Sequence, residues 1–212
     1  MFDMDGLLVD SEPLWFQAEE AVMSRLSGTW SPADQHVLVG GSLDTTVSYL
    51  LSKGTRPAPR DAVARWLIDA MVDLLTTRPL PVMPGAAELL SEVRAAGLPH
   101  ALVTSSEPEV VDAVLAKLDV AFPVIVCAAD VSYPKPDPEG YLLAAAKLGI
   151  EPQHAIALED SVNGVLAAEA AGYRTVAVPS VVAVPRRPSR VVLETLAGVT
   201  LTQLSTRAGL AL

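Results

Sequence analysis

Two aspartates near the start of the chain, Asp3 and Asp5, are separated by a single apolar residue. Residues two apart in an extended strand face the same way, so both carboxylates could serve one site. Gly6 follows directly and lets the backbone turn sharply beside whatever the carboxylates hold. The same short pattern occurs in turns and calcium loops, but an EF-hand needs further oxygen ligands at alternating positions, and residues 7–9 are apolar instead. The pair therefore indicates catalysis only if partners lie elsewhere in the chain.

The chain beyond Pro79 alternates between helical patterns and short apolar runs. The apolar runs lie at 100–104, 124–128, 154–158 and 174–178, and the helical patterns at 85–96, 108–118, 137–148 and 161–171. Apolar strands that alternate with helices predict a parallel sheet covered on both faces. We therefore expect an α/β fold with a doubly wound, Rossmann-like parallel-sheet core.

The segment 14–78 shows only helical patterns, which begin near residues 14, 32, 43 and 60. These patterns predict an all-helical cap domain at 14–78, inserted into a core domain made of residues 1–13 and 79–212. The stretch 181–212 opens with the prolines and arginines of 185–188 and is weakly patterned. It predicts little more than a return to the sheet edge.

Polar residues follow the predicted strands at the edge where open parallel sheets bind ligands. Beyond the first pair these are Thr104, Ser105, Ser106, Lys135, Glu159 and Asp160. Carboxylates suit Mg²⁺, which prefers a few carboxylates, waters and phosphate oxygens. Hydroxyl groups and a lysine can hold the other phosphoryl oxygens, and a carboxylate can attack phosphorus to form an aspartyl phosphate. The set indicates phosphoryl transfer.

Four segments carry a resemblance to a known family. They read FDMDGLLVDSE at 2–12, LVTSS at 102–106, KPDP at 135–138 and LEDSVNG at 158–164. In this order they resemble the motifs of the haloacid dehalogenase superfamily, in the subfamily of beta-phosphoglucomutase-like phosphatases that carry a helical cap after the first motif. Within it, the first and fourth motifs look most like those of bacterial hexose or hexitol 6-phosphate phosphatases.

The resemblance implies a role for each motif residue. Asp3 would be the nucleophile, and Asp5 would protonate the leaving oxygen and then activate water. Lys135 would bridge Asp3 and the phosphate, which Thr104 and the Ser105 backbone would also hold. Mg²⁺ would be bound by Asp3, Asp160, the Asp5 backbone carbonyl and Glu159, the last directly or through water. The cap and entrance residues expected near the leaving group are Trp15, Gly41, Ser42, Leu43 and Ser106.

Other members of the superfamily fit less well. A dehalogenase lacks the second aspartate, and phosphonate hydrolysis needs a cap lysine, for which the sequence offers only Lys53, interpreted as a solvated helix end. A beta-phosphoglucomutase shares all four motifs, but this chain has Leu43 and Trp15 where the mutase has an arginine and a histidine. We therefore expect a Mg²⁺-dependent phosphomonoesterase acting on a small sugar phosphate, with a sugar phosphomutase as the alternative. A phosphoacceptor receiver module is a remote alternative, because receivers lack a helical insert and place their lysine last.

Composition narrows the remaining possibilities. The formal net charge of −10 argues against nucleic-acid binding, which depends on Lys and Arg. No apolar run approaches the roughly 20 residues of a membrane-spanning helix, the amino terminus lacks the basic region of a secretion signal, and the single Cys127 cannot form an internal disulfide. We expect a cytoplasmic monomer that binds a small phosphorylated metabolite. Ser161 and Asn163 are expected to cap a helix, and the three histidines to be structural.

The start of the chain is unusual for a strand that carries a nucleophile. A central strand usually has about five residues, yet only Met1 and Phe2 precede Asp3. We expect a few further apolar residues to precede Met1 in the protein. Were the strand this short, we would expect looser placement of Asp3.

Overall fold

The computed structural model describes residues 1–187 and 190–210, and its centre is a parallel sheet. The strands are β1 (Ala101–Val103), β2 (Val124–Val126), β3 (Ile156–Glu159), β4 (Arg174–Ala177) and β5 (Val191–Val192). β1 pairs with β2, and β4 lies between β3 and β5, in each case parallel. Phe2 forms parallel bridges to Leu102 and Leu158 and so joins the two groups of strands.

The segment 1–3 therefore occupies the centre of the sheet, between β1 and β3. Its backbone is hydrogen-bonded on both sides: the Phe2 N–H donates to the Ala101 carbonyl and the Phe2 carbonyl accepts from the Val103 N–H, while the Asp3 N–H donates to the Leu158 carbonyl. This places Asp3 at the carboxyl end of the central position, as the strand-end argument requires. The residues expected before Met1 stay a prediction.

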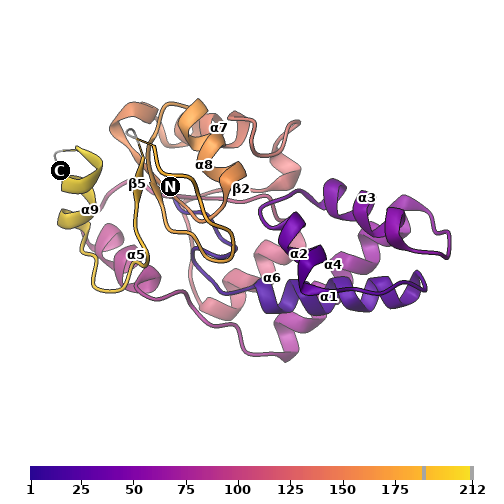
Figure 1. Ribbon diagram of the computed structural model, residues 1–212. Helices are drawn as coiled ribbons and strands as arrows, with labels where there is room; N and C mark the ends of the chain where they lie inside the picture. Colours follow the sequence, from indigo (N-terminus) through magenta and orange to yellow (C-terminus); the bar gives the residue numbers. More distant parts are fainter. Residues whose placement is uncertain (188–189, 211–212) are drawn as a thin grey trace.

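Helices cover both faces of the sheet because successive strand residues point to opposite sides. One face is covered by α7 (Glu139–Leu148) and α8 (Val162–Ala170), which pack on the side that Ala101, Val103 and Ala157 face. The other face, toward which Leu102 and Leu158 point, packs against α5 (Ala86–Ala95), α6 (Pro108–Leu118) and α9 (Leu201–Ala208). Figure 1 shows α7 and α8 above the sheet, α5 below it and α9 at its left edge. The expected doubly wound α/β fold is confirmed.

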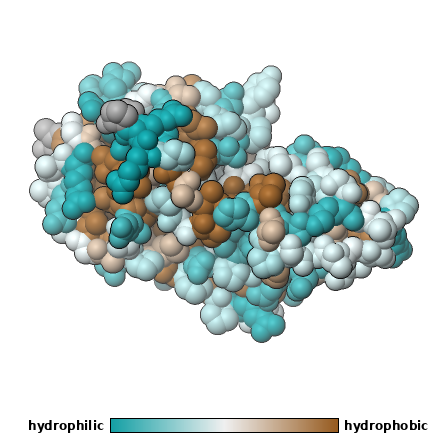
Figure 2. Space-filling view, viewed as in Figure 1, coloured by the Kyte–Doolittle hydropathy of each residue, from teal (hydrophilic) through white to brown (hydrophobic). Residues whose placement is uncertain are grey.

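Four helices between the first motif and Pro79 form a separate layer to the right in Figure 1. They are α1 (Glu12–Arg25), α2 (Pro32–Leu38), α3 (Leu43–Lys53) and α4 (Arg60–Thr77). α4 packs against α1 and α3 and also against α6, so this layer is anchored to the sheet through a helix on its lower face. Figure 2 shows exposed hydrophobic residues mainly over the sheet half of this face, whereas the outer part of α1–α4 is mostly pale and teal. The division into domains at 13/14 and 78/79 stays a prediction.

The helical and apolar patterns agree closely with the observed elements, apart from some of their ends and the last segment of the chain. α1 begins at Glu12, earlier than its first apolar residue. His154 lies in a short 3-10 helix (Pro152–His154) outside the strand, because the turn after α7 extends two residues further than the apolar run suggests. The weakly patterned end contains β5, which is the expected return to the sheet edge, and the short helix α9, which was not expected; Pro188 lies outside the described residues. No helix among the described residues is both long and apolar enough to cross a membrane.

Lys53 is the exposed last residue of α3, as expected, but it also takes part in a polar cluster that the sequence did not indicate. Its ammonium group forms an ion pair with Asp34, whose side chain is buried. The same group lies 5.9 Å from the centroid of the Trp30 ring and 5.8 Å from that of the Tyr49 ring, within the range of cation–π contacts. Asp34 also accepts hydrogen bonds from the Ser31 backbone N–H (3.0 Å), the Ser31 hydroxyl (2.6 Å) and the Tyr49 hydroxyl (2.8 Å). This cluster joins the start of α2 to the end of α3, on either side of the glycines at 40–41.

Replacement of this carboxylate tests whether the cluster holds the layer together. Asp34→Ala removes the acceptor shared by three side chains and should lower the free energy of unfolding by about 1–3 kcal/mol. Chemical denaturation monitored by circular dichroism measures this. Asp44→Ala, which breaks the exposed pair of Asp44 with Arg60, is the matched control and should change stability little. Equal effects of the two variants would contradict the structural role of Asp34.

Candidate active site

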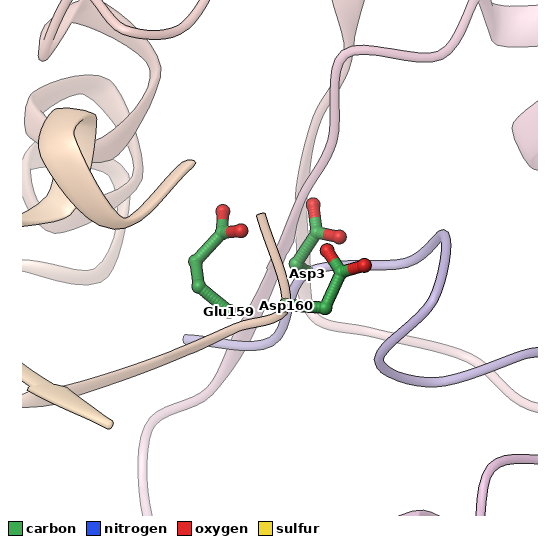
Figure 3. A group of neighbouring side chains, drawn as sticks. All are labelled: Asp3, Glu159 and Asp160. Carbon is green, nitrogen blue, oxygen red and sulfur yellow. The ribbon is translucent and has the colours of Figure 1, made fainter. Parts of the chain in front are cut away.

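Three carboxylates from two neighbouring strands converge at the carboxyl edge of the sheet. Asp3 follows the central segment, and Glu159 and Asp160 lie at the end of β3. One oxygen of each lies within 4.8 Å of an oxygen of the others, and all three residues are buried. Figure 3 shows the three side chains on the same side of the strand ends, with the carboxyl groups of Asp3 and Asp160 adjacent.

Lys135 supplies the positive charge at this cluster. Its Nζ donates to Asp3 Oδ1 at 2.6 Å, to Glu159 Oε1 at 2.5 Å and to the Val103 carbonyl oxygen at 2.9 Å. Burial by itself would lower the pKa of Lys135, but the charges of Asp3 and Glu159 outweigh it and raise that pKa above its ordinary value. The ammonium group therefore stays charged and links the central segment to β3.

One ammonium group does not balance three carboxylates. Burial, with the charge of Glu159, raises the pKa of Asp3 well above its usual range, and the same two causes raise the pKa of Asp160 to about 8. A divalent cation would remove this repulsion, and an all-oxygen donor set suits a hard cation. Gly6 fits such a centre: at φ +74°, a side chain there would place its Cβ 2.1 Å from Asp160 Oδ2, so only glycine allows the backbone this close. The residues present thus fit a divalent metal site.

Asp5 lies in a different setting from Asp3. Its Oδ1 accepts hydrogen bonds from the Ser11 hydroxyl (2.6 Å) and the Trp15 indole N–H (3.0 Å), and its Oδ2 from the Ser106 hydroxyl (2.7 Å). Thr104 Oγ1 lies 3.5 Å from the same Oδ2. The side chain of Asp5 is thus directed toward hydroxyl and indole donors and is not part of the acidic cluster. The metal ligand expected from this residue is its backbone carbonyl, which stays a prediction.

A single cavity connects these groups with the helical layer. It is lined from the sheet side by the acidic and hydroxyl residues and from the other side by α1, α2, α3, α4 and the glycine loop between α2 and α3. The expected site residues that line it are Asp3, Asp5, Trp15, Gly41, Ser42, Leu43, Thr104, Ser105, Ser106, Lys135 and Asp160. Glu159 lies behind this lining, fully buried, where it also accepts a hydrogen bond from the Tyr141 hydroxyl at 2.5 Å. The structure thus brings the expected residues together around one space.

The glycine loop is held by the first turn of α8. Ser161 caps that helix, as expected, by accepting the Gly164 N–H at 3.1 Å. Asn163 was also expected to be a cap, and this is wrong: its side-chain amide donates to the Gly40 carbonyl oxygen at 3.0 Å. A side chain at Gly40 would place its Cβ 2.6 Å from Ser161 Cβ, so the loop lies directly against the sheet domain here.

Three supporting residues were missed at the sequence level. Tyr141 binds Glu159, Ser11 binds Asp5, and Ser180 donates to Asp160 Oδ2 at 2.5 Å. Ser180 follows β4, so applying the strand-end argument to that strand as well would have found it. Ser11 stands at the N-cap of α1 but makes no capping bond with its side chain, since its hydroxyl is used by Asp5. Tyr141 carries no signal beyond being a tyrosine in a helix, and only the fold reveals its partner.

Comparison with known proteins relates this chain to one family of hydrolases and to phosphatases within it. Residues 1–172 match the family model for haloacid dehalogenase-like hydrolases. The chain is 37% identical over 185 residues to hexitol phosphatase B of Escherichia coli, covering 85% of this chain and 82% of that protein. It is 34% identical over 208 residues to hexitol phosphatase A of the same organism, covering 96% and 93%. The crystal structure of CbbY from Rhodobacter sphaeroides in complex with xylulose-(1,5)bisphosphate superposes with a TM-score of 0.86 at 27% identity, covering 96% of each chain.

Removal of the buried ammonium group of Lys135 should lower the stability of the fold. Lys135→Met leaves Asp3 and Glu159 buried without their ammonium partner, and we expect the free energy of unfolding to fall by roughly 3–5 kcal/mol. The measurement is chemical denaturation in the presence of EDTA. Lys147→Met, on the partly exposed pair with Asp130 in the same region, is the control and should cost far less. Unchanged stability of the Lys135 variant would show that the lysine ammonium group does not stabilise this cluster.

Proposed function

The chain belongs to the haloacid dehalogenase-like hydrolase family, and on that premise we propose that it hydrolyses the phosphate monoester of a small polyhydroxylated metabolite, a sugar or sugar alcohol. The observation that carries the proposal is the pair of contrasting settings at one cavity. Asp3 is hydrogen-bonded to Lys135 beside two other carboxylates, whereas Asp5 is bound by hydroxyl and indole donors. Two carboxylates in unlike surroundings suit a nucleophile and an acid/base.

In the first half of the reaction, an oxygen of the Asp3 carboxylate attacks phosphorus and the bond from phosphorus to the ester oxygen breaks. Asp5, in its protonated form, gives its proton to the departing alcohol. In the second half, Asp5 takes a proton from water as the water oxygen attacks phosphorus. The bond between Asp3 and phosphorus then breaks, and inorganic phosphate leaves.

The remaining residues hold the phosphoryl group. Thr104 and Ser105 offer hydrogen bonds to its oxygens at the mouth of the acidic cluster. The three N–H groups of Lys135 are already donated to Asp3, Glu159 and the Val103 carbonyl, so Lys135 acts on the phosphoryl group through its positive charge. Asp3, Asp160, Glu159 and the Asp5 carbonyl would hold Mg²⁺, which when bound offsets the negative charge of the phosphoryl group. Helices α1–α4 would act as a cap that excludes water from the aspartyl phosphate until the alcohol departs.

The lining of the cavity favours one phosphate over two. Among the described residues that line it, Lys135 is the only side chain with a fixed positive charge, and it belongs to the reaction centre. Leu43 occupies the loop position at which a mutase would offer an arginine. Two relatives are named hexitol phosphatases, so hexitol monophosphates are the first probes. A related structure holds a bisphosphate, so bisphosphates must be tested beside them.

A substrate panel tests the proposed activity. With Mg²⁺, the purified protein should release phosphate from sorbitol 6-phosphate or a similar monophosphate in preference to fructose 1,6-bisphosphate. EDTA should abolish the release and added Mg²⁺ should restore it. Interconversion of hexose 1- and 6-phosphates with little free phosphate would support the mutase instead, and inactivity on the whole panel would contradict both.

The nucleophile has its own test. Asp3→Asn keeps the shape of the side chain but removes the attacking carboxylate, and phosphate release should fall by at least about 10³-fold. Circular dichroism should show a folded variant. Asp73→Asn, on the exposed side of α4, is the control and should keep full activity. Retained activity in the Asp3 variant would remove this residue as nucleophile.

A further inference from the structure

A buried tyrosine of α7 lies behind the acidic cluster. Tyr141 is fully buried, and its hydroxyl donates to Glu159 Oε1 at 2.5 Å. The residue lies outside the four sequence motifs, and the proposed reaction assigns it no task. Because it is fully buried, Tyr141 can act on the reaction only through the side chains that it contacts.

Tyr141 contacts both partners of the ion pair between Lys135 and Glu159. The Lys135 Nζ donates to the same Glu159 Oε1, also at 2.5 Å, so two donors converge on one carboxylate oxygen. The Nζ also lies 5.3 Å from the centroid of the Tyr141 ring, within the range of cation–π contacts. The hydroxyl thus binds the carboxylate, and the ring lies against the ammonium group.

Tyr141 is itself held in place by a second buried tyrosine. The Tyr173 hydroxyl donates to the Tyr141 carbonyl oxygen at 3.0 Å, and the two ring centroids lie 5.4 Å apart. Glu159 also packs against the first turn of α8, where a side chain at Gly164 would place its Cβ 1.9 Å from Glu159 Oε2. A hydroxyl on a side chain that is packed this firmly can fix the direction of the carboxylate it binds.

The direction of the Asp3 carboxylate depends on this arrangement. Lys135 donates to Asp3 and to Glu159, so a shift of Glu159 would move the ammonium group that orients Asp3. Among the hydrogen bonds of the described residues, only those from Lys135 and Tyr141 reach Glu159 Oε1. Without the tyrosine hydroxyl that oxygen would keep the lysine alone. A misplacement of reacting groups by about 1 Å can cost roughly 10²-fold in rate.

We propose that Tyr141 is a positioning residue of the reaction: its hydroxyl fixes Glu159, and through Glu159 and Lys135 it fixes the direction in which the Asp3 carboxylate attacks phosphorus. The inference rests on the proposed function and adds to it a residue that does not touch the substrate. The effect belongs to the hydroxyl group, since a phenylalanine at the same place would keep the ring and its packing.

Two substitutions that each remove one oxygen atom separate this role from a merely structural one. Tyr141→Phe removes the hydroxyl that binds Glu159, and Tyr173→Phe removes the other buried hydroxyl of the same pair of rings. With saturating Mg²⁺ and sorbitol 6-phosphate, or the best monophosphate of the panel, kcat of Tyr141→Phe should fall roughly 10- to 100-fold while KM stays within about twofold. Tyr173→Phe should keep both constants within about twofold.

Stability is measured beside activity. Both substitutions remove a buried hydrogen bond and should lower the midpoint of thermal unfolding, followed by circular dichroism. The kcat of each variant is referred to its folded fraction at the assay temperature, so that poor folding cannot imitate a catalytic loss. A merely structural tyrosine at 141 would lower the stability and leave the kcat of the folded protein unchanged.

The outcomes separate the inference from the proposed function. An unchanged kcat in Tyr141→Phe, or an equal loss in Tyr141→Phe and Tyr173→Phe, would overturn the positioning role while leaving the phosphatase activity in place. A loss that lies only in KM would overturn it too, because the hydroxyl would then act on substrate binding. Absence of hydrolysis by the unmodified protein, or full activity in Asp3→Asn, would instead overturn the proposed function itself.

Discussion

The arrangement of the site depends on the ammonium group of Lys135, which lies between Asp3 and Glu159. Asp3 belongs to the first strand position and Glu159 to β3, so their carboxylates approach because the two segments are neighbours in a parallel sheet. Without a cation between them, the two buried charges would repel and each would lack solvation. Lys135 also binds the Val103 carbonyl at the end of β1. One side chain thus fixes the ends of three adjacent strand positions.

Asp3 and Asp5 lie in different surroundings although only one residue separates them in the sequence. Asp3 lies among carboxylates, and the turn at Gly6 lets the following backbone approach Asp160. Asp5 is held instead by donors from the start of α1 and from the loop after β1. The helical layer therefore contributes directly to the setting of Asp5, through Ser11 and Trp15. The contacts of Asp5 thus come from both the helical layer and the sheet edge, so its setting is complete only when the two lie together.

Much of this could be predicted from the sequence. Helix patterns such as 60–77 and 108–118 agree with α4 and α6, because long amphipathic runs carry a strong periodic signal. Because ligand-binding residues follow the carboxyl ends of parallel strands, Thr104, Lys135 and Asp160 could be placed at one edge from the sequence. The contacts of Tyr141 and Asn163 could not be predicted in this way, since neither residue follows a strand. The helix α9 is short, but Leu201, Leu204 and Ala208 stand at helical spacing behind the Thr200–Gln203 capping pair, so its sequence did carry a signal. The burial of Glu19, in contrast, depends on how the helices pack.

The hydrogen bond from Asn163 to the Gly40 carbonyl has a kinetic meaning as well as a structural one. Any motion that widens the cavity at the glycine loop must break this bond and separate Gly40 from Ser161. A single such bond contributes about 0.5–1.5 kcal/mol. That free energy would favour the observed arrangement over one without the bond by a factor of roughly two to ten. The α8 turn beside the acidic cluster thus ties the glycine loop to the sheet by a contact that is weak enough to break without unfolding either part.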